Sequence, residues 1–255
     1  MNSIKFGIKL WSSNSELYHQ IVKYYKEGRF DYLELLYVPG KKDKIRELTD
    51  NKIPIVIHAP NFSQGVIFGD SRFKHNHEML LEILEFASLL NSNEIIVHPD
   101  IGKKENFIRF LKANRDNVLI IENMPKMALD GSTCLGYNIK DMEEFVNVGG
   151  GGFGFCLDFG HAIKSAISQS IDPKKFLVDM IKLKPRMAHI CDGRLNTEKD
   201  EHLSIGEGEF DFKFIVELIK SSCSIEKITF EVPKTNGLEN DLRNIDLLKS
   251  FIYKV

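Results

Sequence analysis

Several kinds of protein are excluded by what this 255-residue sequence lacks. It has no apolar run near the roughly 18 residues that a membrane span requires. Its first residues, MNSIKFGIKLW, carry no apolar core of a signal peptide. The four cysteines form no C-x-x-C pair, which is typical of reduced thiols, and Cys156 and Cys191 lie in apolar runs as small core residues. These absences predict a cytoplasmic protein without membrane attachment.

Charge and short motifs exclude further classes of protein. The 36 acidic residues nearly balance the 34 basic ones, and no block of Lys or Arg stands out, so net charge gives no reason to expect nucleic acid. There is no G-x-S-x-G elbow for a nucleophilic serine. The glycine run at 149–154 precedes an expected strand and lacks the GK[ST] ending of a phosphate-binding loop. We interpret that run as a connection at the floor of the fold.

Short apolar runs alternate with longer stretches of helical periodicity along the chain. Eight runs have the continuous apolar character of parallel strands that are covered on both faces: 4–10, 32–36, 54–58, 94–98, 118–122, 154–158, 187–190 and 227–231. Helical patterns occupy 15–28, 41–51, 77–91, 104–114, 139–148, 172–184, 211–222 and 238–253. Asp172, followed by proline, and Asp211 are expected to cap the helices that they begin.

Eight strand–helix units predict an α/β fold, a (β/α)₈ TIM barrel, with residues 1–255 forming a single domain. The alternative is an open, doubly wound sheet. Such a sheet would need a glycine-rich phosphate turn after the first strand, and the chain has SSN there.

Six consecutive expected strands, the third to the eighth, deliver a histidine or a carboxylate at or near their carboxyl ends. These residues are His58, His98, Glu122, Asp158, His189 and Glu231. His161 follows Asp158 by three residues, and Asp200 and His202 lie two apart in the connection after the seventh strand. Positions two apart in an extended segment face the same side. Barrel enzymes build their sites on this face, so we expect all nine side chains there.

Imidazoles and carboxylates together are typical ligands of zinc, with manganese, cobalt or iron as alternatives. One zinc takes about four protein ligands or fewer, so nine candidate ligands indicate two or three ions. The other three histidines, His19, His75 and His77, lie in helical or loop patterns and are expected to face solvent.

The motifs around these nine residues resemble those of the superfamily of endonuclease IV and the xylose-isomerase-like sugar isomerases and epimerases. They are I-H-A-P (57–60), V-H-P (97–99), I-E-N (121–123), C-L-D-F-G-H-A (156–162), A-H-I-C-D-G (188–193), D-E-H-L-S-I-G-E-G-E-F-D-F (200–212) and F-E-V-P (230–233). The resemblance covers nearly the whole chain and implies the barrel that the strand pattern predicts.

Resemblance to endonuclease IV implies three zinc ions with a shared glutamate. The first ion would be held by His58, His98 and Glu122. The second would be held by Glu122, Asp158, His189 and Glu231. The third would be held by His161, Asp200 and His202. The isomerases imply only the second of these groups, with Glu122 and Glu231 moving protons.

Two departures from endonuclease IV concern the surroundings of this set. Phe159-Gly160 stand where that family usually has Thr-Cys, and the stretch after His58 lacks the tyrosine of its DNA-intercalating loop. Phe62 or Phe68 could act as the wedge instead. These departures concern the loops that would contact DNA and do not change the nine candidate ligands.

The charge of the two possible sites separates two functions. Three zinc ions with four carboxylates leave the site net positive, which suits a phosphate ester, whereas one ion with three carboxylates leaves it net negative and suits a neutral polyol. We therefore favour a zinc-dependent phosphoester hydrolase acting at abasic sites in DNA, in which Glu122 orients the attacking water. The alternative is a sugar or sugar-phosphate isomerase or epimerase with Glu122 and Glu231 as acid and base.

Four further residues near the expected strand ends have less support. Lys9 and Trp11 could contact a phosphate, a base or a sugar, but a structural role is favoured for both and for Glu34. Asn123 follows a candidate ligand and could donate a hydrogen bond to a substrate.

Overall fold

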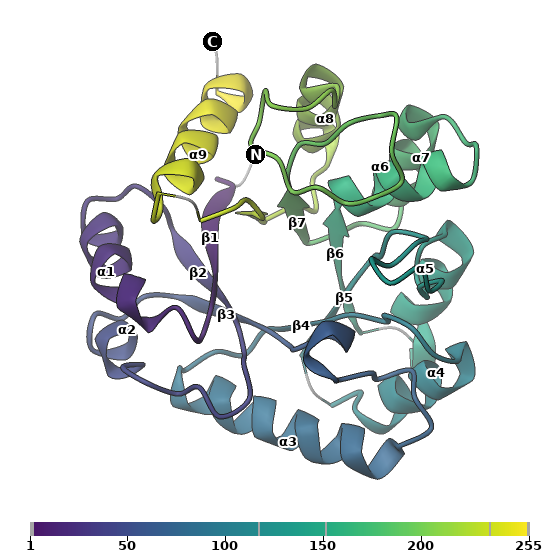
Figure 1. Ribbon diagram of the computed structural model, residues 1–255, viewed down its shortest axis with the longest axis horizontal. Coiled ribbons are helices and arrows are strands. Elements are labelled where there is room, and N and C mark those ends of the chain that lie inside the picture. The colour runs from purple at the N-terminus through teal and green to yellow at the C-terminus, as the bar shows by residue number, and fades with distance from the viewer. Residues whose placement is uncertain (1–2, 117, 151, 235, 254–255) are drawn as a thin grey trace.

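Figure 1 shows the computed structural model, in which strands occupy the centre and helices surround them. The structure describes residues 3–116, 118–150, 152–234 and 236–253. Each strand pairs in parallel with the next, and β8 pairs with β1, so the sheet closes into a barrel. The strands are β1 (Lys5–Trp11), β2 (Tyr32–Leu36), β3 (Ile55–His58), β4 (Ile95–Val97), β5 (Leu119–Glu122), β6 (Gly154–Asp158), β7 (Met187–Ile190) and β8 (Lys227–Phe230). The prediction of a single-domain TIM barrel is confirmed, and the alternative prediction of an open, doubly wound sheet is wrong.

The helices follow the strands in the expected alternation. They are α1 (Tyr18–Lys26), α2 (Arg46–Asp50), α3 (Phe73–Leu89), α4 (Lys104–Ala113), α5 (Ile139–Val146), α6 (Phe159–Ser168), α7 (Pro173–Ile181), α8 (Phe212–Ser221) and α9 (Glu239–Ile252), with 3₁₀ turns η1 (Ser15–Leu17), η2 (Phe62–Gln64) and η3 (Val148–Gly150). Asp172 and Asp211 cap α7 and α8 as predicted, because their side chains accept from the backbone N–H three residues later. No helix within the described part of the chain is long and apolar enough to cross a membrane.

Helix α6 was not among the helices predicted from the sequence. Its apolar residues Phe159, Ala162, Ile163 and Ala166 do form a stripe with helical spacing, but residues 159–166 are all buried, so the polar side with His161, Lys164 and Ser165 is also covered by protein. Its N-cap is Asp158, whose Oδ1 accepts from the backbone N–H of His161 at 2.6 Å. A Cβ at Gly160 would lie 2.7 Å from Sγ of Cys191, so a larger residue there would collide with the chain that leaves β7.

Other boundaries differ by small amounts. Strands β4 and β8 end at Val97 and Phe230, so His98 and Glu231 each stand one residue beyond the ladder. Helix α2 is shorter than the 41–51 pattern because Lys44 has φ +54°, which is incompatible with an α-helix. The glycine connection at 149–154 precedes β6 on the floor side, although residue 151 lies outside the described residues.

The barrel interior is stacked in layers that follow the two-residue period of its strands. One buried apolar layer consists of Tyr32, Val56, Ile96, Ile120, Cys156 and Met187. Two residues further along each of these strands stand Glu34, His58, His98, Glu122, Asp158 and His189. Because side chains two apart point to the same face, the apolar layer is the floor on which the polar layer rests. The two-residue alternation of side chains along each strand therefore places the candidate ligands directly above the apolar layer.

Gly7 shows how closely this floor is packed. A Cβ on Gly7 would lie 2.4 Å from the ring of Tyr32, so the tyrosine occupies the space that a side chain on β1 would need. The Tyr32 hydroxyl is 2.6 Å from Oγ1 of Thr229, which closes the layer across β8. Cys156 and Cys191 are buried as small core residues, as predicted.

Candidate metal centre

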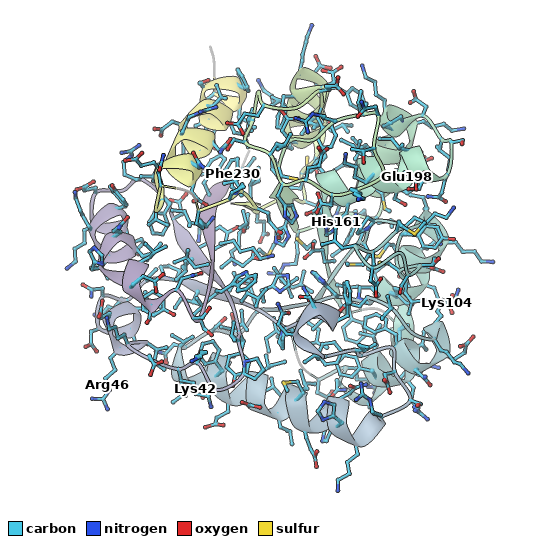
Figure 2. The ribbon with its side chains drawn as sticks, viewed as in Figure 1. Lys42, Arg46, Lys104, His161, Glu198 and Phe230 are labelled. Atoms are coloured by element: carbon cyan, nitrogen blue, oxygen red, sulfur yellow. The ribbon has the colours of Figure 1, made fainter. Side chains whose placement is uncertain are left out.

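The structure brings the nine candidate ligands together at the mouth of the barrel. In Figure 2, His161 lies near the centre of the view, whereas Arg46 and Lys104 lie at its periphery. Ligand-type atoms that lie within 4.8 Å of one another form groups that coincide with the three sets implied by the resemblance to endonuclease IV. His19, His75 and His77 are exposed on α1 and α3, as expected.

The first group is built on three strand ends. Nε2 of His58 lies 3.3 Å from Oε2 of Glu122, and Nε2 of His98 lies 3.0 Å from the same oxygen. Nδ1 of His58 is 2.7 Å from the carbonyl oxygen of Ala59 and must carry the proton that this contact needs. The free lone pair of His58 is therefore on Nε2, which faces the centre.

The second group shares Glu122 with the first. Nδ1 of His189 lies 3.2 Å from Oε2 of Glu122, 2.7 Å from Oε1 of Glu231 and 3.9 Å from Oδ2 of Asp158. Its other nitrogen, Nε2, lies 2.8 Å from Oε2 of Glu34, so Nε2 donates to that carboxylate and the Nδ1 lone pair faces the three acids. A histidine held by a carboxylate in this way is oriented for a cation.

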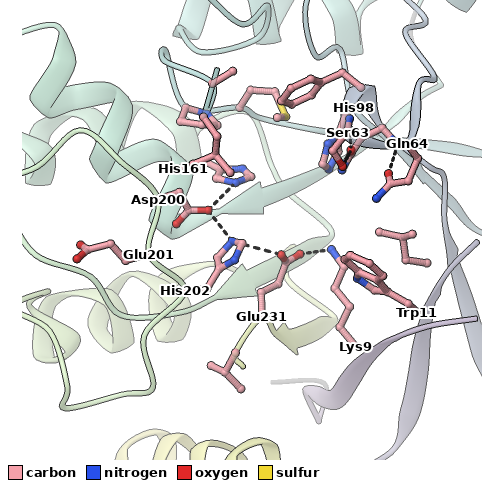
Figure 3. Close-up of a pocket in the computed structure, with 18 of the residues that line it drawn as sticks. Lys9, Trp11, Ser63, Gln64, His98, His161, Asp200, Glu201, His202 and Glu231 are labelled. Atoms are coloured by element: carbon pink, nitrogen blue, oxygen red, sulfur yellow. Dashed lines mark hydrogen bonds and ion pairs between the residues drawn. The ribbon is translucent and has the colours of Figure 1, made fainter. Parts of the chain in front are cut away.

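The third group joins a helix to a loop. Nδ1 of His161 donates to the carbonyl oxygen of Asn123 at 2.9 Å, which leaves Nε2 at 3.2 Å from Oδ2 of Asp200. Nε2 of His202 lies 2.5 Å from the same oxygen, and Figure 3 shows Asp200 between the two imidazoles. His202 has φ +50°, so the backbone leaves the extended form that the two-residue spacing assumed, yet both side chains still face the centre.

Glu34 and Lys9 surround the second group from β2 and β1. The carboxylate of Glu34 is completely buried and accepts from Oγ1 of Thr229 at 2.7 Å as well as from His189. Nζ of Lys9 pairs with Oε1 of Glu231 and lies 3.4 Å from Oε1 of Glu34. The positions of Lys9 and Glu34 near the ends of their strands were expected from the sequence. Their contacts join residues that are far apart along the chain, so these contacts could not be predicted from the sequence.

Two further groupings involve residues outside the nine. One combines Cys156 with Glu122 and His189, and the other combines Glu34 with His58 and Glu231. Burial raises the pKa of the Cys156 thiol to about 12, so that residue remains a protonated core thiol. Glu34 is already engaged by Lys9, His189 and Thr229. Neither residue is therefore a better ligand than the nine.

Neighbouring carboxylates set the protonation of the histidines. Burial alone would lower the pKa of His98, but Glu122 and Asp100 outweigh burial and raise it to about 9. Burial likewise opposes a charged His202, but the carboxylate of Asp200 raises its pKa to about 9. Without a cation, protons on these rings balance the charge of the carboxylates.

His58 and Asp158 shift in the opposite sense. Burial lowers the pKa of His58, and the ammonium group of Lys9 lowers it further. Burial raises the pKa of Asp158 to about 6, helped by the nearby carboxylates of Glu122 and Glu231. The pKa of Lys9 is raised because the carboxylates of Glu231 and Glu34 overcome the effect of its burial.

Unsatisfied atoms test whether the site fits cations. Among the described residues, four buried site atoms make no hydrogen bond although oppositely charged groups lie beside them: Glu122 Oε1, Asp158 Oδ2, His189 Nδ1 and His202 Nε2. Buried polar atoms without partners are costly, and when the rings are neutral the lone pairs of these atoms are aimed at a common centre and form no hydrogen bond with one another. Such atoms can be satisfied by a cation between them, so the donor set fits metal binding.

A cavity of about 710 Å³ opens above the centre. His98, His161, Asp200, His202 and Glu231 line its base. Its walls carry apolar and amide side chains, among them Trp11, Phe62, Met124, Asn61 and Gln64. Trp11 is half exposed beside Lys9, where Figure 3 shows both. Space for a substrate therefore adjoins the candidate ligands directly.

Two predictions about the residues around the ligands are corrected by the structure. Phe68 is buried and its ring stacks on Phe110 with centroids 4.4 Å apart, so it cannot act as a wedge in the mouth. Asn123 exchanges two hydrogen bonds with the backbone of Asp158, at 2.8 and 3.0 Å, and ties β5 to β6 instead of facing a substrate. Phe62 does line the cavity.

Residues 22–251 match the family model described as a xylose isomerase-like TIM barrel. The chain belongs to this family. A relative of this xylose isomerase-like chain, the probable endonuclease 4 of Halothermothrix orenii, is 25% identical over 227 residues, which are 82% of this chain and 81% of that protein.

Two solved structures share the xylose isomerase-like barrel. A D-tagatose 3-epimerase-like protein aligns with a TM-score of 0.75 and 22% identity, covering 99% of this chain and 98% of that chain. Endonuclease IV from Thermus thermophilus aligns with a TM-score of 0.73 and 18% identity, covering 98% and 100%. At these identities the likeness establishes the fold alone, and both reaction classes share it.

Proposed function

We propose that this chain is a metal-dependent phosphoester hydrolase that binds two or three divalent cations, with zinc favoured, through His58, His98, Glu122, Asp158, His161, His189, Asp200, His202 and Glu231. The proposed unit is the whole barrel, residues 1–255, and the proposed substrate is DNA with an abasic site. The residues themselves, more than the relatives, support this proposal.

The surroundings of Glu122 are the main support. Its Oε2 lies 3.0–3.3 Å from nitrogens of His58, His98 and His189, and its Oε1 lies 3.3 Å from Nδ1 of His161. An isomerase needs this carboxylate free to take a proton from a substrate carbon. A carboxylate enclosed by four imidazoles would instead be shared between two cations, as a multinuclear hydrolase requires.

Each part of the chain has a role in this reaction. Bound cations supply positive charge that stabilises a reacting phosphoryl group and makes water more acidic. Glu122 would orient the attacking water and Glu231 would accept its proton, while Lys9 holds Glu231 by its Oε1. His202, whose side chain is 42% exposed, is the most exposed of the nine residues, and as a ligand of the third cation it would help to stabilise the leaving oxygen.

The cavity walls support a substrate with a flat ring or an unstacked base. Trp11 and Phe62 line the opening, and aromatic rings stack on bases without regard to sequence. DNA affinity depends largely on cationic contacts to phosphates. Within the described lining the lysines are Lys9 and Lys234, so the cations at the centre would supply much of the phosphate attraction.

That scarcity of lysine is the observation that favours a second candidate function. Lys9 is paired with two carboxylates, and Nζ of Lys234 is 2.6 Å from Oδ1 of Asp241. A neutral sugar needs no cationic track, so an isomerase or epimerase acting through a single ion at the second group is the alternative.

Elemental analysis combined with two activity assays separates these functions. We expect two or three equivalents of metal and incision of an oligonucleotide with an abasic site. His202→Ala should lose one equivalent and at least about tenfold in activity, as is typical when metal sites are weakened. His77→Ala, which changes an exposed histidine on α3, should match the wild type. One equivalent of metal, no incision and interconversion of ketose and aldose would favour the isomerase.

A further inference from the structure

Lys164 is a buried charged residue that lies outside the nine ligands. It belongs to α6, three residues after His161, and its side chain is 0% exposed. Its Nζ donates to the carbonyl oxygen of Arg194 at 2.6 Å, to that of Thr197 at 3.1 Å and to Oε2 of Glu201 at 3.0 Å. An ammonium group has three donors, so Lys164 is fully satisfied by one short segment, 194–201.

That segment belongs to the connection between β7 and α8, residues 191–211, all of which the structure describes. This connection contains neither helix nor strand, and connections of such length are uncommon unless they serve a function. Its base is tied by backbone hydrogen bonds of 2.7 and 2.9 Å between Asp192 and Leu203. The Asp192 carboxylate also accepts from the backbone N–H groups of Gly206 and Gly208. Lys164 holds residues 194–201, which lie between the Asp192 and Leu203 ends of this base.

The same stretch carries two members of the third group. Glu201, which accepts from Lys164, stands between Asp200 and His202, and the third member, His161, is on the helix of Lys164. Glu201 is held further by Arg194, whose backbone N and Nη1 donate to it at 2.8 and 2.7 Å. The ammonium group of Lys164 thus connects helix α6 to the 191–211 connection, and the third group consists of side chains from these two elements.

We propose that Lys164 is a positioning residue for the third cation, because it holds Asp200 and His202 at a fixed distance from His161. This inference rests on the proposed function, since it assumes a cation in the third group. A buried ammonium is costly unless paired, so a lysine that served only to fill space would be replaced without loss by an apolar side chain. Lys164 is instead paired wholly with the ligand-bearing loop.

The test is metal stoichiometry and affinity in Lys164→Met, a change that keeps an unbranched side chain of similar volume and removes its donors. We expect the third cation to bind at least about tenfold more weakly, while the other two cations are retained. Lys174→Met is the matched control, because exposed Lys174 pairs with Asp211 at the far end of the same connection, at 2.6 Å. That control should bind as the wild type does.

A double variant identifies which cation is affected. If Lys164 acts through the third group, adding Lys164→Met to His202→Ala should cost no further cation, because residues that act together are not additive. Amide hydrogen exchange in residues 194–203 should also rise in Lys164→Met and not in Lys174→Met. Unchanged third-cation affinity with unchanged exchange would overturn the inference and leave the hydrolase proposal standing.

Glu201→Gln provides the same test if Lys164→Met does not fold. It removes the charge that pairs with Lys164 at a position that is 17% exposed, and we expect selective weakening of the third cation again. Equal affinity for all cations would contradict the positioning role. A wild-type protein that binds one cation would refute the proposed function and, with it, a third cation for Lys164 to position.

Discussion

The first and third groups of candidate ligands are built in opposite ways. His58 and Glu122 end β3 and β5, and both are completely buried, so the hydrogen-bonded barrel fixes their positions. Asp200 and His202 belong to a connection without regular structure, and the side chain of His202 is 42% exposed. Ligands on strand ends inherit their geometry from the fold. Ligands on a long loop require dedicated contacts, which here come from Lys164 and Asp192.

The largest test of this comparison is Glu122→Gln. Glu122 is shared by the first and second groups, so its loss should release two cations and reduce activity by more than about 100-fold, beyond the effect of an outer hydrogen-bond partner. Metal analysis and incision assays would measure this.

Glu94→Gln is the control for a buried glutamate at the other end of the barrel. Glu94 pairs with Arg186 and Lys227 on the floor side, so this variant should lose stability and keep its metals. Retention of all cations by Glu122→Gln would contradict the bridging role and favour a single-ion site.

The strand-built parts of the molecule could be predicted from sequence, and the loop-built parts only in part. Val56 and His58, or Ile120 and Glu122, obey the two-residue alternation, so burial of one places the other in the mouth. Helix α6 was not predicted, although Phe159, Ala162, Ile163 and Ala166 have helical spacing; burial of the polar side of this helix depends on contacts that the sequence does not show. A lysine in a helical segment is usually solvated, so nothing in the sequence marked Lys164 as buried.

The number of protons released on metal binding should differ between the first and third groups. The pKa of His98 is raised to about 9 by Glu122 and Asp100 against the effect of burial, whereas burial lowers that of His58. In the third group the pKa of His202 is raised to about 9 by Asp200, and that of His161 is raised by Asp158 and Asp200, again against burial.

Between about pH 7 and 8 the first cation should therefore displace about one proton and the third about two, because ligands must be deprotonated. Affinity for the third cation then falls more steeply as the pH falls. Calorimetric titration in buffers of different ionisation enthalpy counts the protons, and His202→Ala should remove the two-proton event. Equal proton numbers for both cations would show that the two groups do not differ in this respect.

The smallest expected effect concerns the support of His189 within the strand-built region. Glu34→Gln weakens the acceptor that orients this ring and leaves Lys9 with one carboxylate fewer, so the second cation should bind about 10–100-fold more weakly. Thr229→Val removes a hydrogen bond to Glu34 but leaves its charge, so its effect should be no more than about tenfold. Competition with a chromophoric chelator would rank the two variants. If Thr229→Val were as harmful as Lys164→Met, the strand-built groups would need outer support as much as the loop-built group does.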